Sequence, residues 1–481
     1  MRKMQCALLL MGRDLCFGLH QKLNIVQKKA VKEYKKMQEK ILKKSSHIDL
    51  IEGNIVAGLV RFAIPLMIGN LLQQFYNIAD TLIVGRFLGK EALAAVGSAY
   101  SIMVFLTSVI LGLCMGSSAF LSIQYGRKDR ASFSSGNFMS FILIGGFAAT
   151  LNVVVYLGMD NILKLLQIPS DVYASMRSYV VIIYGGLMAT FLYNYFANCL
   201  RAVGNSLVPL LFLGISSILN IALDILFVAI FAFGIQGAAV ATVFSQYVSG
   251  IGIWIYAWKK MPDLRFERNR MHFQKDILKS ILNLSILTSL QQSIMNFGIL
   301  MVQGLVNSFG AAVMAAFGAA VKIDTFAYSP VQDFGNAFST FVAQNHGAGK
   351  GERIRVGGRK AVLAVFLFCT AISLLVFLFA GGLMAIFTED SEIIGIGVSY
   401  LRTEGIFYCL IGFLFLFYGY FRAVEQPFVS VVLTITSLGT RVLLAYLLSG
   451  MPMIGYRGIW VSIPVGWVLA DLIGLCFLKR K

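Results

Sequence analysis

The sequence predicts an all-α integral membrane protein with twelve transmembrane helices, arranged as two pseudo-symmetric six-helix bundles. Three observations support this fold class. Of the 481 residues, 58% are apolar and only 13% are charged, whereas about 25% are charged in an ordinary soluble domain. The apolar residues form long runs, and a helix that spans a lipid bilayer needs about 20 such residues. The second half of the chain also repeats the first half, at a constant offset in the numbering.

Composition and motifs exclude several classes of protein. A soluble enzyme of this size would need far more surface charge. The net charge of +18 does not indicate a nucleic-acid partner, because the cytoplasmic loops of membrane proteins collect Lys and Arg. The sequence contains no G-x-x-x-x-G-K-[ST] loop, no H-E-x-x-H motif and no C-x-x-C pair among its seven cysteines. We therefore expect no ATP, no cofactor and no enzymatic centre.

Residues 1–50 form a basic leader that differs from the rest of the chain. The leader holds twelve basic and four acidic residues. Between residues 21 and 44, apolar side chains recur at helical spacing among nine lysines, which is typical of a helix lying on anionic lipid. A solvated tail, or an upstream start codon, explains the same composition, and we favour this explanation. Truncation to Met37 should then leave activity intact.

After Asn54, long charge-poor runs predict the spans in order. The stretch between Lys279 and Lys322 has no charged residue, so it must hold one helix, a tight turn and part of the next helix. The twelve predicted spans cover residues 57–84, 92–118, 133–158, 178–200, 207–231, 236–258, 280–304, 312–342, 360–386, 398–421, 427–448 and 457–478.

Loop charge predicts the orientation of the spans. Basic residues gather in the even-numbered loops, at 127–130, 201, 259–279, 350–360 and 422, while the opposite loops are mainly acidic. Because cytoplasmic loops carry the excess of Lys and Arg, we predict a multi-pass protein of the cell membrane with both termini in the cytoplasm. Its predicted parts are the leader 1–50, an N-terminal bundle 51–262, a cytoplasmic linker 263–279 and a C-terminal bundle 280–481.

The repeat, at offset 221, indicates an internal duplication. Gly89 matches Gly310, and the triplet Arg-Ala-Val that begins at Arg201 matches the one that begins at Arg422. Six spans per repeat is an even number, so both halves enter the membrane in the same orientation, related by an axis along the membrane normal. Two such bundles can rock about a central cavity and expose a fixed site to one side at a time.

Polar and acidic residues within spans mark a candidate site, because inserting a charge into a bilayer costs at least about 2.5–3.5 kcal/mol. Three of these residues share one face of span 1, two share a face of span 5, and one lies in span 6 at a similar depth. The set comprises Asp80, Asn220, Asp224 and Thr242 as the coupling site, with Gln73 and Asn77 as polar partners.

The chemistry of this set leaves two ions open. Two carboxylates, an amide oxygen and a hydroxyl would form an all-oxygen site for Na+. Alternatively, two close carboxylates cannot both ionise cheaply and hold a proton between them. Either ion would compete with a cationic compound for the same groups, which suffices for exchange. A structural alternative is that Asp80 and Asp224 simply tie helices together.

The repeat indicates one principal site, in the N-terminal bundle. At the offset of the repeat, the four coupling residues become Met301, Arg441, Ala445 and Ile463. The second half offers other ionisable residues, among them Lys322 and Asp333, three helical turns apart on span 8. Two interpretations of Asp333 stay open. In the first, it contacts a cationic substrate or joins a proton path. In the second, it pairs with Arg441 or a backbone group.

The motif Gln73-x-x-x-Asn77-x-x-Asp80-x-x-x-Val84-Gly85-Arg86-x-x-Gly89 resembles the first-helix signature of the multidrug and toxic compound extrusion (MATE) transporters. The segments Leu200-Arg201-Ala202-x-Gly204, Gln344-x-x-Gly347-Ala348-Gly349 and Phe421-Arg422-Ala423 fit the same family. The resemblance covers about residues 50–480. It implies a V-shaped pair of bundles that exports organic, often cationic, compounds in exchange for Na+ or H+. It also implies that Asp80, Asn220, Asp224 and Thr242 form the cation site, with Asn198 as a polar partner.

Three hypotheses follow for the function. The leading one is a monomeric secondary antiporter that exports small organic cations without ATP. A second is a flippase for a lipid-linked saccharide or another amphiphile, which predicts a strongly basic central cavity. A third is a passive channel, which would not move a substrate uphill when an ion gradient is imposed.

Overall fold

The computed structural model describes residues 47–165, 170–266 and 272–479, and these residues are almost entirely helical. The amphipathic helix expected between residues 21 and 44 lies outside the described residues. By its internal contacts the chain divides into Met1–His47 and Ile48–Lys481. The second of these units carries the fold and the candidate site.

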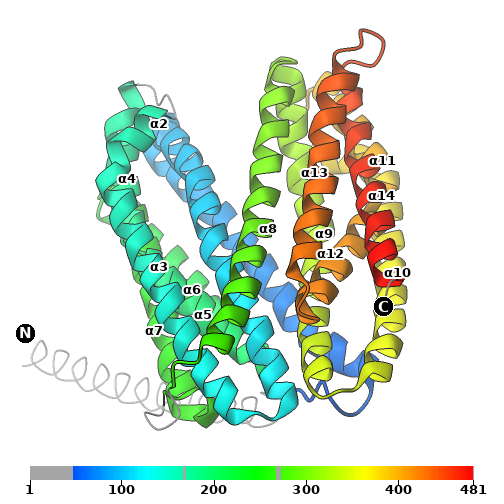
Figure 1. Ribbon diagram of the computed structural model, residues 1–481. Helices are drawn as coiled ribbons and strands as arrows, with labels where there is room; N and C mark the ends of the chain where they lie inside the picture. The colour runs from blue at the N-terminus through cyan, green and yellow to red at the C-terminus, as the bar shows by residue number, and fades with distance from the viewer. Residues whose placement is uncertain (1–46, 166–169, 267–271, 480–481) are drawn as a thin grey trace, which may run out of the picture. The chain divides into compact units, whose positions relative to one another are not determined.

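The helices of the second unit follow one another with short connections (Figure 1). In chain order they are α2 (Ile55–Arg127), α3 (Arg130–Leu165), α4 (Ser170–Tyr184), α5 (Leu187–Ala202), α6 (Leu207–Asp224), the π-helix η1 (Ile225–Ile230), α7 (Gly234–Lys260), the 3-10 turn η2 (Pro262–Leu264), α8 (Lys275–Asn307), α9 (Ala311–Gly347), α10 (Gly351–Ala385), α11 (Ser391–Gly405), α12 (Tyr408–Ala423), α13 (Pro427–Ser449) and α14 (Arg457–Lys479).

The predicted fold class is confirmed. Within the described ranges, ten helices are long and apolar enough to cross a membrane, and two bent helix pairs raise the number to twelve. The bent pairs are α4 with α5, at 42°, and α11 with α12, at 52°. The long helix α2 supplies two spans, because Gly89 interrupts it with a φ of +83°, a conformation that glycine adopts at little cost.

The internal duplication is visible in the backbone itself. A positive φ is uncommon outside glycine, yet several residues of the first half with positive φ have a counterpart with positive φ at the offset of the repeat. These pairs are Gly89 and Gly310, Lys128 and Gly349, Gly204 and Glu425, and Gly234 and Gly455. The two bends share the same offset, since α4 ends at Tyr184 and α11 ends at Gly405. The repeat therefore fixes where helices break as well as where they lie.

The two halves pack together through α2, α8 and α9. Helix α8 runs along both α2 and α13, and α9 packs against α2 and α12 (Figure 1). A close approach between the halves lies near the basic loops and is itself duplicated. A Cβ atom on Gly126 would collide with the backbone carbonyl of Gln344, and one on Gly347 would collide with the carbonyl of Ile123. Glycine at both positions permits this crossing.

A short segment before α2, residues 48–53, links the two halves at the same end, and we refer to it as the strap. In the first half, the backbone N–H of Ile48 donates to the carbonyl of Gly204 at 2.9 Å. In the second half, the amide of Asn345 donates to the carbonyl of Leu50 at 3.0 Å. Arg353 of α10 donates to the carbonyl oxygens of Glu52, at 2.9 Å, and Gly53, at 3.0 Å.

Candidate functional site

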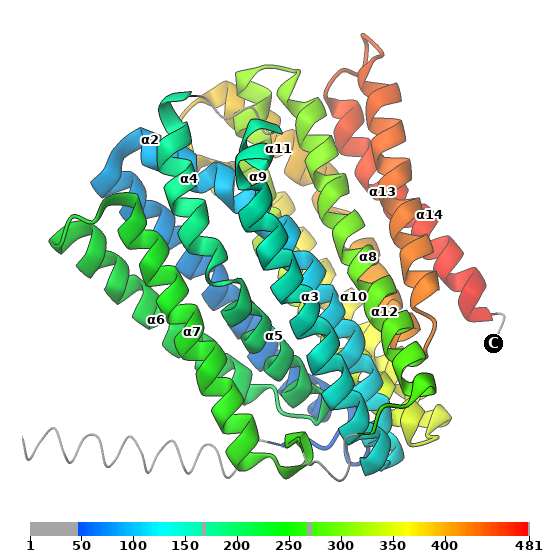
Figure 2. The ribbon, with the colours of Figure 1, turned by 60° about the vertical axis from the view of Figure 1, so that its left-hand side comes forward.

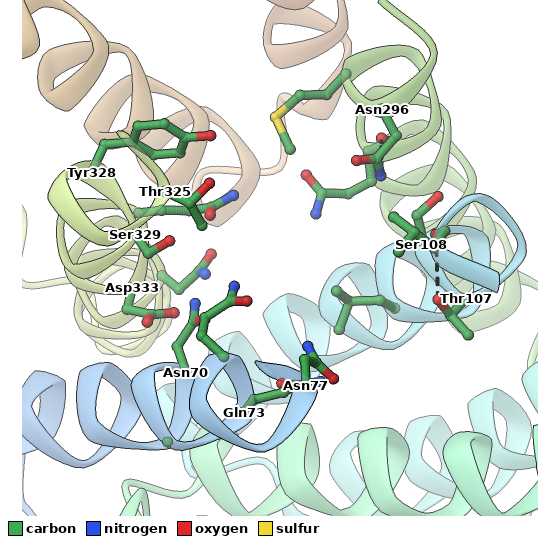
Figure 3. A pocket seen from close by; sticks show the side chains of 18 of the residues that line it. Asn70, Gln73, Asn77, Thr107, Ser108, Asn296, Thr325, Tyr328, Ser329 and Asp333 are labelled. Atoms are coloured by element: carbon green, nitrogen blue, oxygen red, sulfur yellow. Dashed lines mark hydrogen bonds between the residues drawn. The ribbon is translucent and has the colours of Figure 1, made fainter. Parts of the chain in front are cut away.

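A cavity of about 1150 Å³ lies between the two halves and is lined by polar side chains from both. Figure 3 shows amide side chains of α2 pointing toward hydroxyl and carboxyl groups of α9, with Asn296 of α8 on another wall. The labelled amide residues of α2 are Asn70, Gln73 and Asn77, and the labelled α9 residues are Thr325, Tyr328, Ser329 and Asp333.

The carboxyl groups of Asp80 and Asp224 lie within hydrogen-bonding reach of each other. Asp80 projects from α2 and lines the cavity, whereas Asp224, the last residue of α6, is completely buried behind it. Neither oxygen of Asp224 receives a hydrogen bond from a described residue, and Oδ1 of Asp80 also lacks a donor. The structure thus brings together two acids whose helices are far apart in the sequence.

The amide and hydroxyl predicted for the same site lie beside each other. The amide nitrogen of Asn220 donates to the Thr242 hydroxyl at 3.2 Å, across α6 and α7, which run side by side (Figure 2). The amide oxygen of Asn220 has no donor among the described residues. Directly after Asp224 the helix widens into the π-helix η1, a geometry that often occurs at functional sites.

These groups form a cluster of acceptor oxygens without donors in the described part of the chain. Buried acceptors are normally hydrogen-bonded, and burying an uncompensated carboxylate is strongly unfavourable. A proton shared between the acids, or a small cation held by Asp80, Asp224 and the Asn220 oxygen, would satisfy the set. The residues therefore fit a cation such as Na+ or H+ on the cavity wall.

The predicted polar partners divide into two groups. Gln73 and Asn77 line the cavity on the same helix as Asp80 (Figure 3). Asn198 also lines the cavity, but its amide donates to the carbonyl of Asn194 at 2.8 Å, one turn back in α5. Asn198 is thus held by its own helix.

One interpretation of Asp333 proves wrong, because this residue does not pair with Arg441. Its carboxyl group lies within reach of the Asn70 amide and near the Arg201 guanidinium. Arg441 instead acts on Tyr328 and Glu404, and Tyr328 precedes Asp333 on α9 by more than one helical turn. Asp333 therefore connects the two halves across the cavity.

Lys322 and Arg441 line the second half of the cavity. The side chain of Lys322 is exposed there, while Nε of Arg441 is buried and donates to no described group. Arg441 acts electrostatically on Glu404, which lies within reach of Asp324. The second half thus holds a buried acid pair of its own.

Two tyrosines and one amide at the site were not among the residues predicted from the sequence. Tyr179 lies near both acids of the first half, and Tyr400 lies within hydrogen-bonding reach of both acids of the second half. These two tyrosines are separated by the offset of the repeat, so the repeat contained a signal for them. Asn70 precedes Gln73 by about one helical turn and extends the same polar face.

A duplicated set of membrane-spanning helices around a polar cavity, with unpaired acids on the wall, defines a membrane transporter. The MatE family model matches residues 65–226 and 285–447, which together make up most of the chain and repeat at nearly the same offset. The chain belongs to this family. It is a multi-pass membrane transporter and not an enzyme.

Individual relatives align along almost their whole length. The "Probable multidrug resistance protein YpnP" of Bacillus subtilis (strain 168) is 28% identical over 434 residues, covering 90% of this chain and 96% of the relative. The "FAD transporter" of Shewanella oneidensis is 24% identical, covering 86% and 92%. A crystal structure of MATE in complex with MaL6 superposes with a TM-score of 0.85 at 25% identity, covering 91% of this chain and 98% of that one.

Proposed function

We propose that this chain is a secondary antiporter that exports organic, mainly cationic, compounds in exchange for Na+ or H+ by alternating access. The observation that carries the proposal is the donor-free cluster of Asp80, Asp224 and Asn220. Asp80 belongs to the cavity wall, so a substrate cation in the cavity and a coupling ion in the cluster interact with the same carboxylate. Binding of one ion weakens binding of the other, which is the requirement for exchange.

The two acid pairs differ in their partners, and this difference supports a single exchange site in the first half. The acids of the second half already have partners within the protein. There the hydroxyl of Tyr408 donates to Asp324, Tyr400 is within reach of both acids, and Arg441 supplies a fixed positive charge near Glu404. The pair Asp80–Asp224 has no such cation close by among the described residues. Its charge must be balanced by an ion from solution.

The orientation follows from the basic loops. We place those loops, both termini and the strap on the cytoplasmic side of the cell membrane, with residues 51–262 and 280–481 as the two bundles joined by the linker 263–279. The glycine crossing and the strap join the halves at this end. The structure then corresponds to a state that is closed toward the cytoplasm, and the protein works as a monomer without ATP.

The relatives support export of drug-like compounds. YpnP carries the description "Probable multidrug resistance protein", and a cavity lined by amides, hydroxyls, Met and aromatic rings suits varied ligands. The flippase alternative predicts a strongly basic cavity. The described lining residues instead include four acidic side chains, Asp80, Asp324, Asp333 and Glu404, and four basic ones, Arg201, Lys322, Arg422 and Arg441. This balance favours the exporter.

The decisive experiment measures uptake of a cationic dye into inverted membrane vesicles, with sodium and pH gradients imposed separately. We expect the wild type to accumulate dye uphill under one of the two gradients. Asp80→Asn at the same protein level should lose this accumulation. Glu389→Gln is a matched control, because Glu389 is exposed between α10 and α11.

The same assay can contradict the proposal in two ways. If Asp80→Asn accumulates dye like the wild type, the acid pair has only a structural role. If the wild type equilibrates dye without accumulating it under either gradient, the protein is a passive channel.

A further inference from the structure

Two arginines occupy equivalent positions at the end of the cavity nearest the basic loops. Arg201 lies in the last turn of α5, and Arg422 lies in the last turn of α12. Their positions differ by the offset of the repeat, so the duplication relates them. Both line the cavity. The donor-free cluster of Asp80, Asp224 and Asn220, which we call the coupling cluster, uses neither of them.

Arg422 is a buried cation without an acidic partner among the described residues. The residue is only 5% exposed. The guanidinium donates from Nε to the Ser339 hydroxyl at 3.3 Å and from Nη2 to the Asn336 amide oxygen at 3.1 Å. Both acceptors are neutral, and no described acidic side chain pairs with this group. Arginine stays protonated in proteins, and a buried charge normally has a partner of opposite sign.

Arg201 adds a second positive charge that is only partly balanced. Its Nε atom is buried and donates to no described group. The acid that faces it is Asp333, on α9, which acts on Arg201 at electrostatic range and lies within reach of Asn70. With Asp333 ionised, the two arginines and one acid leave one net positive charge at this end of the cavity.

We propose that Arg201 and Arg422 form an anion-binding subsite, which holds a carboxylate or phosphate group of the transported molecule. The guanidinium fork suits these groups, because it donates two parallel hydrogen bonds to their oxygens. The inference rests on the proposed export function and narrows its substrate class. Preferred substrates are amphoteric, with a cationic part near Asp80 and an anionic part near the arginines.

The geometry also sets a scale for such a molecule. Asp333, which faces Arg201, lies within reach of Asn70 on α2. Asp80 lies further along the same helix, almost three turns beyond Asn70, which corresponds to about 15 Å at the rise of an α-helix. Substrates whose opposite charges are separated by about this distance can contact both ends of the cavity at once, whereas a more compact molecule can engage the arginines with its anionic group alone.

Tetramethylrhodamine and its methyl ester provide a matched pair of probes, because they differ only in one carboxylate. We would measure binding of both dyes to the purified full-length chain in detergent by fluorescence polarisation. Arg201→Gln and Arg422→Gln should each weaken binding of the free acid by about tenfold or more, the scale of a charge-assisted hydrogen bond. Binding of the ester should change by less than about twofold on the same reasoning, because the ester offers no anionic oxygen.

Arg355→Gln is the control, because this exposed arginine of α10 lies at the protein surface and forms its ion pair with Glu352. Arg422→Lys tests whether charge is the cause, and it should recover part of the affinity for the acid. A variant that weakens acid and ester equally, or neither, overturns the subsite. If the wild type binds the ester, but the arginine variants bind the free acid as tightly as the wild type does, the export function stands without the subsite. If it binds neither dye, both proposals fail.

Discussion

The side-chain amide of Asn220 donates to the hydroxyl of Thr242 at 3.2 Å, and this bond joins α6 to α7. The bond occupies the amide nitrogen, while the amide oxygen of Asn220 has no donor among the described residues. Thr242 thereby orients the Asn220 amide so that its oxygen remains free as an acceptor. Asp224 lies one helical turn after Asn220 on α6. The Thr242 hydroxyl therefore determines that Asn220 contributes an acceptor oxygen to the cluster.

Thr242→Val should weaken binding of the coupling ion by about tenfold. The substitution keeps the shape of the side chain but removes the acceptor of the Asn220 amide, and losing such a bond costs about 1 kcal/mol or more. Affinity for Na+ would be measured by titration calorimetry, and affinity for H+ by the pH dependence of efflux. Thr242→Ser retains the hydroxyl and should stay close to the wild type. Equal loss in both variants would contradict the role of the hydroxyl.

Gly126→Ala and Gly347→Ala should each lower the thermal midpoint in detergent. An added Cβ meets a backbone carbonyl of the other half at both positions, and overpacking of this kind costs about 1–3 kcal/mol. Gly318→Ala is the control on the same helix as Gly347, since no atom lies within 4 Å of its added Cβ. This control should be neutral, or stabilising by up to about 1 kcal/mol. A control as unstable as the two variants would show that the crossing is not the cause.

Arg353→Ala should loosen the strap. Arg353 donates to the carbonyl oxygens of Glu52 and Gly53, so its removal leaves the strap attached to the second half mainly through Asn345 and Lys350. Hydrogen exchange followed by mass spectrometry should show faster exchange of residues 48–53 in this variant. Arg355→Ala, two positions away and mostly exposed, should exchange like the wild type. Unchanged exchange in Arg353→Ala would mean that the arginine does not hold the strap.

Two truncations separate the leader from the strap. Removal of residues 1–36 should leave dye efflux unchanged, because the described bonds between the strap and the two halves begin at Ile48. Removal of residues 1–53 deletes the strap and buried Leu50, and it should lower both the thermal midpoint and efflux. The comparison uses matched expression levels in the vesicle assay. Loss of efflux in the shorter truncation would assign a role to the leader.

Local sequence was sufficient to predict the spans and part of the site. Length and hydropathy locate each span, because the cost of inserting a segment into lipid depends mainly on its own residues. The gaps between predicted spans contain Gly89 and Gly310, which match at the offset of the repeat, and the backbone has a positive φ at both. Helical spacing placed Gln73, Asn77 and Asp80 on one face, and all three line the cavity.

Contacts between distant spans could not be predicted in the same way. The sequence left open whether Asp333 pairs with Arg441, and only the packing of α9 on α2 placed it near Asn70 and Arg201 instead. The strap likewise acquires its role from helices that are far away along the chain.

The sequence by itself determined the number, order and apolar character of the spans, since these depend on local transfer of side chains into lipid. Tertiary structure decided which polar faces meet, because that depends on how helices cross, as Gly126 and Gly347 permit.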